Sequence, residues 1–540
     1  MAAGWRIVPA GGPLSDTLPD SVAPRRRLAR STAIFAAATG LSRVLGLVRE
    51  MVAANYFGVQ GRINAFTVAF QIPNLVRALV ADSALSSAFV PVFSDLLEKG
   101  DRRRAWRVAS SLFWLMVLGL GALTALFMLL APLLVRPFHP VDPGLAVGLS
   151  QVLFPIVALL GVSGIIVGIL NCYDEFSVPA LTPVAWNVAI IIGLVIGVPQ
   201  AHSDSSKLYI YAAAILAGTV VQVLLPIPWL RGRDDRLRLV IDWRDPAVWR
   251  TLKLMIPVTL SLGLINVNAV VDTFFASRLL DPNLAPAAID KAFRVYMLPQ
   301  GMFSVAVATI LFPTLSRLSA RDDWDGFRET VSLGLRQIAF LLVPASAVIA
   351  VLATPIVRLL YQRGAFTPHQ TTVVAGALIA FTLGLTFNGT MLLLNRSFFS
   401  LQSNWLPTAI ALGNLVVNGV LDAFFYRFGV WGIPLSTSVV NLAGTVALIV
   451  VLRRRLGRLD LDAVSESLLR VVAASALAAA VGWGVWHTID PVVGRSFFGQ
   501  LGSLLPALAL AGCVYLVACK VLRVRELDTL TGVMRRRSGG

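Results

Sequence analysis

Long apolar stretches follow one another along almost the whole chain, and they restrict the fold more than any other feature of the sequence. A helix that crosses a bilayer needs about 20 mostly apolar residues. Fourteen segments meet this requirement, at approximately 31–57, 63–95, 106–136, 145–171, 181–199, 208–230, 250–277, 288–316, 331–361, 371–397, 405–426, 430–452, 465–488 and 500–521. The segments between them are too short for a separate extramembrane domain. The sequence therefore predicts an all-α polytopic membrane protein with about 14 transmembrane helices.

The composition agrees with this class and argues against several others. The chain is 56% hydrophobic and 14% charged, with a mean hydropathy of +0.76, which lies outside the range of soluble proteins. Its net charge of +17 indicates loops facing anionic lipid, rather than nucleic-acid binding. The three cysteines have no CxxC spacing, so no disulfide or metal framework is implied. The chain has no GxxxxGK[ST] loop and only four scattered histidines, and neither an ATP-driven engine nor a histidine-based catalytic site is predicted.

Basic and basic-poor loops alternate between the apolar segments. KGDRRRAWR (99–107), RGRDDRLRLVIDWR (231–244) and RRRLGR (453–458) fall on one side, whereas loops such as RPFHPVDPG and LLDPNLAP on the other side carry few Lys or Arg. By the positive-inside rule both termini are predicted to be cytoplasmic. The first thirty residues lack the apolar core of a signal peptide, and we expect a disordered basic tail there.

An internal repeat divides the apolar segments into two halves. FQIPN…AFVPVFSDL (70–96) recurs as YMLPQ…ILFPTLSRL (296–318), and LNCYDEFSVPALTP (170–183) recurs as LNRSFFSLQSNWLP (394–407). The repeat predicts two parallel six-helix halves followed by two extra helices, which is a transporter architecture. The predicted organisation is a tail (1–30), a first lobe (31–230), a cytoplasmic linker (231–249), a second lobe (250–455), an extra helix pair (456–522) and a basic tail (523–540).

Charged side chains inside the predicted spans are candidates for function. Arg43, Arg49 and Glu50 lie in LSRVLGLVREM (41–51), Arg77 lies in the second span, and Arg294 lies at the start of the eighth. Each such charge costs about 2.5–3.5 kcal/mol on insertion scales and usually faces a cavity or a partner. A net-positive cavity in a carrier favours an anionic substrate, because arginine binds phosphate through a bidentate fork. The alternative is that each arginine reaches toward lipid head groups or binds backbone carbonyls.

A second polar set, with two carboxylates, lies in the latter half of the chain. The carboxylates are Asp272 on the seventh span and Asp422 on the eleventh, and the neighbouring amide and hydroxyl side chains are Asn268, Asn414, Asn418 and Thr437. Carboxylate, amide and hydroxyl oxygens are typical ligands of a hard cation such as Na⁺, and the two carboxylates could instead form a protonatable relay. Hydrogen bonding between helices is the alternative explanation, and it accounts better for the amides than for the two aspartates.

Several long strings resemble one family of transporters. GLSRVLGLVREMVAANYFG, NAFTVAFQIPNLVRALVADSALSSAFVPVFSDL, ILNCYDEFSVPALTPVAWN and LYQRGAFT are similar to sequences of the MurJ/MviN lipid II flippases of the MOP transporter superfamily. The match runs in register from about residue 31 to 455, and beyond that only hydropathy and helix number agree. The resemblance implies a transporter and not an enzyme. Its substrate would be lipid II, undecaprenyl-diphosphate-MurNAc-pentapeptide-GlcNAc, moved by alternating access to the outer leaflet of a bacterial cytoplasmic membrane.

The resemblance also implies roles for individual residues. The arginines that bind the diphosphate would be Arg43, Arg49, Arg77 and Arg294, and the cavity or its gates would include Ser42, Glu50 and Asn64. The sodium site of some members would fall on Asp272, Asn418, Asp422, Thr437 and the Ile433 carbonyl. The last two helices would form a groove for the lipid tail. Membrane potential, Na⁺ or both would drive transport, with no further cofactor. A monomer is expected, in contact with membrane lipid, and cell-division or elongation proteins are candidate partners.

Two positions depart from the family pattern. Many members have an aspartate where this chain has Asn64, and an acidic residue where it has Met297. Losing both carboxylates makes the cavity more positive and removes any gating salt bridge that relied on them.

Three alternatives to a lipid II flippase were weighed. A cation or drug antiporter of the same superfamily should have an acidic first-half cavity, whereas this one is rich in arginine. A polysaccharide-lipid flippase would as a rule have twelve spans, without the additional pair at 465–521. A membrane transferase acting on polyprenyl phosphates would need clustered acidic or histidine residues near the membrane face, and the sequence shows no such cluster.

Overall fold

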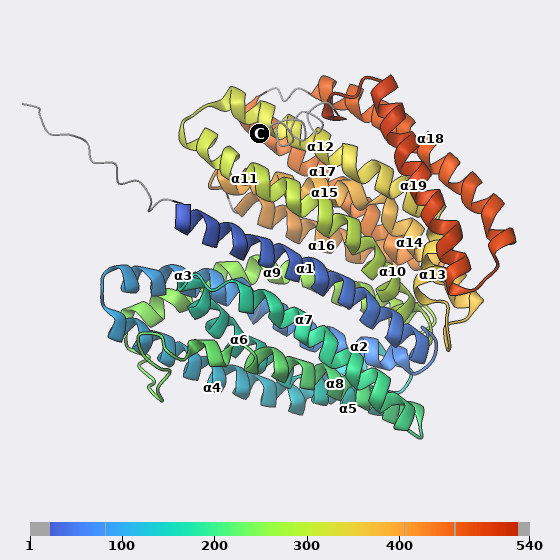
Figure 1. Ribbon diagram of the computed structural model, residues 1–540. Coiled ribbons are helices and arrows are strands. Elements are labelled where there is room, and N and C mark those ends of the chain that lie inside the picture. Colours follow the sequence, from blue (N-terminus) through green and yellow to red (C-terminus); the bar gives the residue numbers. More distant parts are fainter. Residues whose placement is uncertain (1–21, 81–82, 404, 458–460, 528–540) are drawn as a thin grey trace, which may run out of the picture.

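The computed structural model describes residues 22–80, 83–403, 405–457 and 461–527, which are helical almost throughout and contain no strand (Figure 1). The first half comprises α1 (Val22–Phe57), α2 (Ile63–Val80), α3 (Ser83–Glu98), α4 (Arg102–Val135), α5 (Pro143–Leu153), α6 (Pro155–Cys172), α7 (Ser177–Ile192) and α8 (Asp204–Leu224). The second half comprises α9 (Pro246–Leu279), α10 (Ala285–Pro299), α11 (Val305–Ala320), α12 (Trp324–Val351), α13 (Ala353–Tyr361), α14 (Pro368–Leu383), α15 (Leu385–Ser400), α16 (Trp405–Phe425) and α17 (Gly432–Leu456). A final pair follows, α18 (Leu461–Val493) and α19 (Phe497–Val521).

Each of the fourteen predicted spans coincides with one helix or with two consecutive helices. By length and apolar composition, ten helices of the described chain are able to cross a membrane, and the pair α14–α15, bent by 43°, would be an eleventh. The remaining units, α1, α2–α3 and α9, carry many of the charged and amide side chains considered below. The predicted fold class, an all-α polytopic membrane protein, is confirmed.

The predicted terminal tails need a correction at their inner ends. Helix α1 already begins at Val22, so residues 22–30 are helical and not disordered as expected. At the other end, Val524 and Glu526 are buried, and Glu526 forms an ion pair with Arg336 of α12 at 3.3 Å. The first residues of the predicted C-terminal tail therefore pack on the helices. The rest of both tails, 1–21 and 528–540, lies outside the described residues.

The helices form two bundles, with α1 and α9 where the bundles meet (Figure 1). Helices α2–α8 pack together on one side and α10–α17 on the other, while α18 and α19 pack on each other and on α12. Helix α1 packs mainly on α7, whereas α9 contacts α2 and α3 of the first bundle and α16 of the second. The start of α9 is firmly placed in the first bundle, because Val248 and Met255 are buried with Phe89 and Trp106. Helix α9 therefore connects the two bundles along its length.

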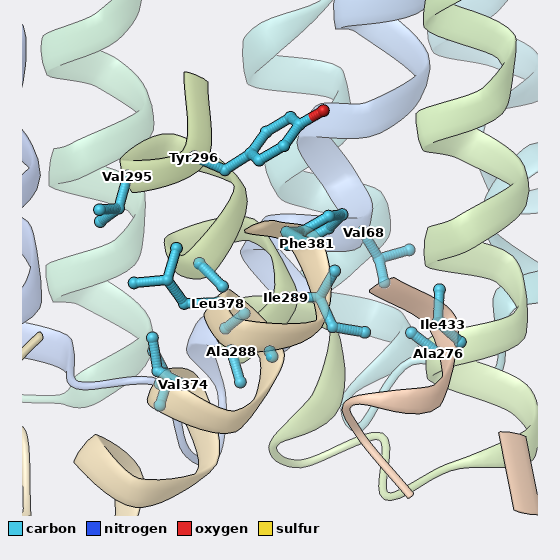
Figure 2. Packing of buried hydrophobic residues seen from close by; sticks show 14 of the residues in the cluster. Val68, Ala276, Ala288, Ile289, Val295, Tyr296, Val374, Leu378, Phe381 and Ile433 are labelled. Atoms are coloured by element: carbon cyan, nitrogen blue, oxygen red, sulfur yellow. The ribbon is translucent and has the colours of Figure 1, made fainter. Parts of the chain in front are cut away.

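Small residues bring α10 close to its neighbours. The sequence APAAIDKAF opens this helix, and Ala288, which is completely buried, lets α14 approach closely. In Figure 2, Ala288 of α10 lies beside Leu378 and Val374 of α14. Because this face of α10 is occupied by apolar packing, its charged residues project from another face.

The linker between the lobes is docked along α4. The backbone amides of Arg238 and Asp242 donate hydrogen bonds to the hydroxyls of Ser110 and Ser111, each at 3.0 Å. The indole of Trp114 donates to the Arg238 carbonyl at 2.9 Å. These contacts satisfy backbone groups of a segment that has no regular structure of its own.

A salt bridge adds to this docking, and it involves a carboxylate with a shifted pKa. Arg104 binds Asp245 through two hydrogen bonds, of 3.2 and 3.3 Å. Burial raises the pKa of Asp245, but hydrogen bonds from Arg104 and the Ala247 amide, with the charges of Arg104 and Arg107, outweigh it and leave the pKa below its usual range. The contribution of the ionised carboxylate is therefore complete above the ordinary pKa of about 3.9, and it is lost as the pH falls through the lower folded-state pKa.

Removing this charge should loosen the linker at neutral pH. We expect Asp245→Asn to speed tryptic cleavage after Arg238 by a few-fold, since the ion pair is lost while asparagine still caps α9. Mass spectrometry of a digestion time course measures this rate. Asp204→Asn is the matched control, because the ion pair of Asp204 is with Lys207 on α8, away from the linker. Equal cleavage of both variants and the parent protein would contradict the assignment.

Candidate functional site

A cavity of about 500 Å³ lies between the two bundles, lined mainly by α1, α2, α6, α7 and α8 on one side and by α9 and α10 on the other. Its charged lining residues are Arg49, Glu50, Arg77, Asp290, Lys291 and Arg294. Its other polar lining residues include Gln71, Asn74, Trp186, Tyr211, Gln222 and Asn266. Four cations thus face two carboxylates within the described lining. The charged lining residues are positive on balance, in line with the sequence-based expectation.

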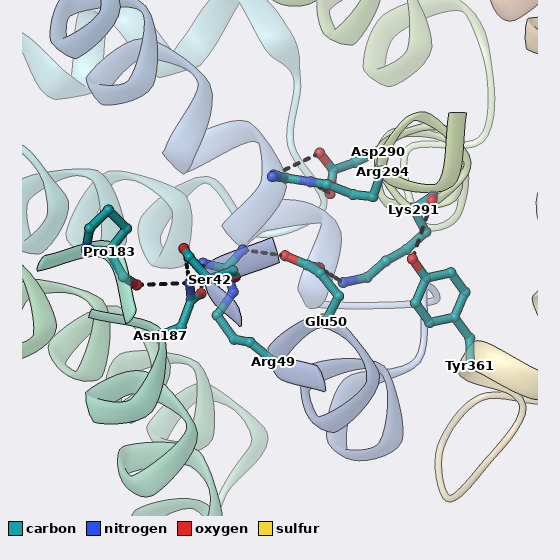
Figure 3. A network of polar contacts seen from close by, with 9 residues as sticks. All are labelled: Ser42, Arg49, Glu50, Pro183, Asn187, Asp290, Lys291, Arg294 and Tyr361. Carbon is teal, nitrogen blue, oxygen red and sulfur yellow. Dashed lines mark hydrogen bonds and ion pairs between the residues drawn. The ribbon is translucent and has the colours of Figure 1, made fainter. Parts of the chain in front are cut away.

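Arg49 is the most completely held of the cavity arginines. Its Nη2 forms an ion pair with Glu50 at 2.7 Å, and its Nη1 donates to Oδ1 of Asn187 at 3.2 Å. The guanidinium also lies 4.6 Å above the ring of Trp186, in cation–π geometry. Arg49 is only 8% exposed. These partners fix the orientation of the guanidinium toward the cavity (Figure 3).

Asn187 connects this arginine to Ser42. The amide nitrogen of Asn187 donates to the Ser42 hydroxyl at 3.4 Å and to the Pro183 carbonyl at 2.9 Å. Ser42, a predicted cavity or gate residue, therefore lies behind Asn187 and does not line the cavity itself.

Helix α10 contributes three charged residues to the cavity from the second bundle. Arg294 pairs with Asp290, one turn earlier, at 3.2 Å. The ammonium of Lys291 binds the second oxygen of Glu50, so this carboxylate joins α1 to α10 (Figure 3). The aromatic ring of Tyr361 lies 5.8 Å from the same ammonium. Glu50 therefore bridges one cation from each bundle.

The two other predicted arginines occupy different surroundings. Arg77 lines the cavity, and its Nε and Nη2 donate to Oδ1 of Asn74 at 3.1 and 2.9 Å. Arg43 is largely exposed and does not belong to the cavity lining. A methyl group at Gly301, in the second bundle, would come within 3.1 Å of Nη1 of Arg43. Arg43 and Arg49 project in different directions because six residues turn a helix well away from a common face.

Asn64 joins the two bundles at one end of the cavity. Its side-chain nitrogen donates to the carbonyls of Asn283 at 2.5 Å, Val59 at 3.0 Å and Gly61 at 3.1 Å. Its oxygen accepts from the Ala287 amide at 2.9 Å. Asn64 is 1% exposed, and the amide performs a joining role that a carboxylate could not perform in the same way, because a carboxylate donates no hydrogen bond. Met297, the other departure from the family pattern, lines the cavity and is half-exposed.

A second set of backbone contacts closes the same end. The Ala365 amide donates to the Asn55 carbonyl at 2.9 Å, and the Val59 amide donates to Oε1 of Gln370 at 3.1 Å. Gly364 has a φ of +54°, and a Cβ there would lie 2.3 Å from the Asn55 carbonyl oxygen. Only glycine permits this approach. The loops 57–63, 279–285 and 361–368 thus hold the bundles together at this end.

The structure brings the predicted acidic site together in the second half. The side-chain nitrogen of Asn418 donates to Asp272 at 2.6 Å and to Asp422 at 3.1 Å. Thr437 lies 3.5 Å from Asp272 and 3.4 Å from the Ile433 carbonyl. Asp272 is 8% exposed, and Asn418 and Asp422 are completely buried. Helices α9, α16 and α17 supply these residues.

The chemistry of this set fits a cation. Two buried carboxylates with no cationic side chain among their hydrogen-bond and ion-pair partners in the described chain need a positive charge or a proton. The side-chain oxygen of Asn418 is buried without a hydrogen-bond partner in the part of the chain that is described. Together with the Ile433 carbonyl, these hard oxygens match the preference of Na⁺. Ser436, which donates to Asp422 and to the Ile433 carbonyl, belongs to the same network.

Several functional neighbours were missed by sequence reasoning. Asp290 and Lys291 lie at the start of the predicted span 288–316, where charges are typical of a helix end. Asn187, Trp186 and Ser436 are ordinary residues of apolar helices, and nothing local in the sequence connects them to their partners. Asp290 and Arg294 are four residues apart, and this helical spacing was the one feature of the sequence that indicated an ion pair between them.

Two helical bundles around a charged internal cavity define a multi-pass membrane transporter. A family model described as lipid II flippase MurJ matches residues 53–501 of the chain. The chain belongs to the MurJ family of lipid II flippases. It is a transporter of the bacterial cytoplasmic membrane and not an enzyme, and the prediction from the sequence is confirmed.

Curated relatives extend over most of the chain. A probable lipid II flippase MurJ of Synechocystis sp. is 31% identical over 521 residues, which cover 94% of this chain and 96% of the relative. The lipid II flippase MurJ of Burkholderia cenocepacia is 33% identical over 434 residues, covering 77% of this chain and 82% of the relative.

Solved structures agree with the fold. A lipid II flippase MurJ in an inward closed conformation superposes with a TM-score of 0.74 at 26% identity, covering 91% of this chain and 98% of the other. An inward-facing multidrug resistance MATE transporter of the MOP superfamily gives a TM-score of 0.67 at 16% identity. The superposition covers 80% of this chain and 99% of the other. The second likeness concerns the fold alone.

Proposed function

We propose that the cavity binds the diphosphate of lipid II while the lipid moves between leaflets by alternating access of the two bundles. The observation that supports this most directly is that Arg49 and Arg77 of the first bundle and Arg294 of the second line one cavity. Guanidinium groups form paired, charge-assisted hydrogen bonds with phosphate oxygens. Arg43, which faces Gly301 across the bundles, joins this set when the bundles change their relative position.

The proposed direction is from the cytoplasmic leaflet to the outer leaflet. The loops rich in Lys and Arg, including 99–107 and 231–244, would face the cytoplasm with both termini. The loops 57–63, 279–285 and 361–368 then lie on the outer side, and their contacts close the cavity toward the outside.

The helix pair α18–α19 would hold the polyprenyl tail. The two helices pack on each other and on α12 at the flank of the second bundle (Figure 1). Leu469, Val517 and Val521 are exposed apolar side chains on this pair. Such a surface suits an isoprenoid chain that stays in lipid while the head group passes through the cavity.

The acidic site of α9, α16 and α17 would couple transport to an ion. Asp272, Asn418, Asp422, Thr437 and the Ile433 carbonyl would hold Na⁺, with a proton as the alternative occupant. A bound Na⁺ would offset one of the two carboxylate charges and bring the three helices together. Membrane potential would add to this driving force, because the moving charges cross part of the field.

Transport measurements on purified protein in vesicles test both the translocation of lipid II and the ion site. We expect translocation of lipid II, with about a tenfold acceleration by an imposed Na⁺ gradient. Asp272→Asn should abolish the Na⁺ effect and keep any effect of membrane potential, since asparagine preserves the shape and removes the charge. Asn414→Ala, on the same helix as Asp422 but with its side chain against Gly444, is the control. Failure to move lipid II under any gradient would refute the function, and an unchanged Na⁺ effect in Asp272→Asn would refute the ion site.

A further inference from the structure

The ion pair between Glu50 and Lys291 lies in the cavity wall and is almost completely buried. The side chains of Glu50 and Lys291 are 7% and 8% exposed. The two residues are 241 positions apart in the sequence and come from α1 and α10. Glu50 binds Arg49 through its other oxygen at 2.7 Å. One carboxylate therefore neutralises two cations that both line the cavity.

Lys291 depends on this carboxylate more than its neighbour Arg294 does. Arg294 has a partner on its own helix, Asp290, at 3.2 Å. The described partners of the Lys291 ammonium are Glu50 and the face of the Tyr361 ring. A buried ammonium without an anion is strongly unfavourable. If Glu50 moves away, Lys291 needs another anion at the same place.

The substrate brings such an anion into the same cavity. A diphosphate bound to Arg49 and Arg294 lies between α1 and α10, and Lys291 is adjacent to Arg294 at i−3 on α10. A diphosphate has more acceptor oxygens than one carboxylate, and the lysine ammonium is a compact cation that phosphate binds well. The cavity wall therefore holds a cation whose resting partner resembles the charged part of the substrate.

We propose that Lys291 is a further binding residue for the diphosphate, and that Glu50 occupies its ammonium until the diphosphate displaces it. The proposal rests on the function proposed above and goes beyond it, because it assigns a residue of α10 and a competitor on α1. The displaced ion pair is also a contact between the bundles, close to the hydrogen bonds of Asn64 with Asn283 and Ala287. Binding of the diphosphate thus removes one of the contacts that keep the outer end closed.

Two variants isolate the contribution of Lys291 to binding. Glu50→Gln and the double variant Glu50→Gln/Lys291→Gln both lack the ion pair between the bundles, and only the first retains the ammonium. With undecaprenyl diphosphate in nanodiscs as the probe, we expect Glu50→Gln to bind about tenfold more tightly than the parent protein, because the competitor is gone. The double variant should bind about tenfold more weakly than Glu50→Gln, as expected for one charge-assisted hydrogen bond.

The outcomes separate this proposal from the function on which it rests. Equal affinities of the two variants would show that Lys291 only joins the bundles and would overturn the proposal, while binding by the parent protein would leave the proposed function intact. Absence of undecaprenyl diphosphate binding in the parent protein and in Glu50→Gln would overturn both. In the Glu50→Gln background, Lys291→Arg keeps the cation and should bind within a few-fold of Glu50→Gln. A loss as large as that of Glu50→Gln/Lys291→Gln would also count against the proposal.

A distance measurement tests the displacement itself. Spin labels at Gln60 and His369, both exposed and on opposite sides of the outer closure, report the separation of the bundles in a background without the three native cysteines. Undecaprenyl diphosphate should increase the long-distance population of the parent protein, and Glu50→Gln should show this increase without ligand. A Glu50→Gln protein that remains as closed as the parent would overturn the proposed link between displacement and opening.

Discussion

Replacing Arg49 by alanine is expected to reduce lipid II translocation about 100-fold while the protein still inserts into the membrane. Each charge-assisted hydrogen bond to phosphate contributes about 1.5–3 kcal/mol, and the loss of two at the lower value corresponds to a factor of about 100. Insertion should survive, because Glu50 keeps Lys291 as its partner when Arg49 is removed. Arg49→Lys should recover only part of the activity, since lysine has no planar fork and stacks less well on Trp186.

The measurement is translocation in vesicles, together with growth of a strain depleted of its own flippase. Arg278→Ala is a matched control, because Arg278 is an arginine on α9 that contacts Phe274 and the Pro137 carbonyl, away from the cavity lining. Normal growth and normal translocation with Arg49→Ala, at equal protein in the membrane, would contradict the proposed role of the cavity arginines.

Restoring the acidic residue that many family members have at position 64 is expected to open the outer end of this protein. In Asn64→Asp the hydrogen bond donated across the closure to the Asn283 carbonyl is lost, at about 1 kcal/mol, together with the local bonds to the Val59 and Gly61 carbonyls. The new carboxylate would also face those carbonyl oxygens with its own negative charge. Loss of the one bond across the closure shifts the closed-to-open ratio about fivefold, and the repulsion at the Asn283 carbonyl adds to this shift.

Spin-label distances between positions 60 and 369 measure this shift directly. Thr67→Val is the control, because Thr67 lies one turn further along α2 and its hydroxyl bonds only to the Ile63 carbonyl of the same helix, at 3.1 Å, among the hydrogen bonds described. We expect Asn64→Asp to be predominantly open and to transport poorly, since a protein that does not close cannot complete the cycle. A closed population equal to that of Thr67→Val would refute the role of the Asn64 amide.

Much of the fold could be predicted because its determinants are local. Apolar length alone predicted fourteen segments that coincide with described helices, since a helix in lipid must satisfy all its backbone hydrogen bonds within itself. The cost of a charge in lipid also singled out Arg49, Arg77 and Arg294, and the structure places all three in the cavity lining. The cost of a charge in lipid also singled out Asp272 and Asp422, and in the structure both accept hydrogen bonds from Asn418.

The partners of these charges could not be predicted, because they depend on which helices meet. Arg43 and Arg49 belong to one helix and carry the same charge, yet only Arg49 lines the cavity. The ion pair of Glu50 with Lys291 joins residues 241 positions apart, and no local pattern indicates it.

Asn64 shows most clearly the difference between what the sequence indicates and what the tertiary structure decides. Its sequence position indicated only the loss of an acid, whereas its contacts show an amide that donates to the Asn283 carbonyl and accepts from the Ala287 amide across the closure. The sequence by itself determined that the chain crosses a membrane many times and that its interior is positively charged, because burial of apolar length and the cost of a charge are properties of each helix alone. The tertiary structure decided which charge neutralises which, and where the two bundles are joined, because hydrogen bonds and ion pairs require atoms of separate helices to lie within about 3 Å of each other.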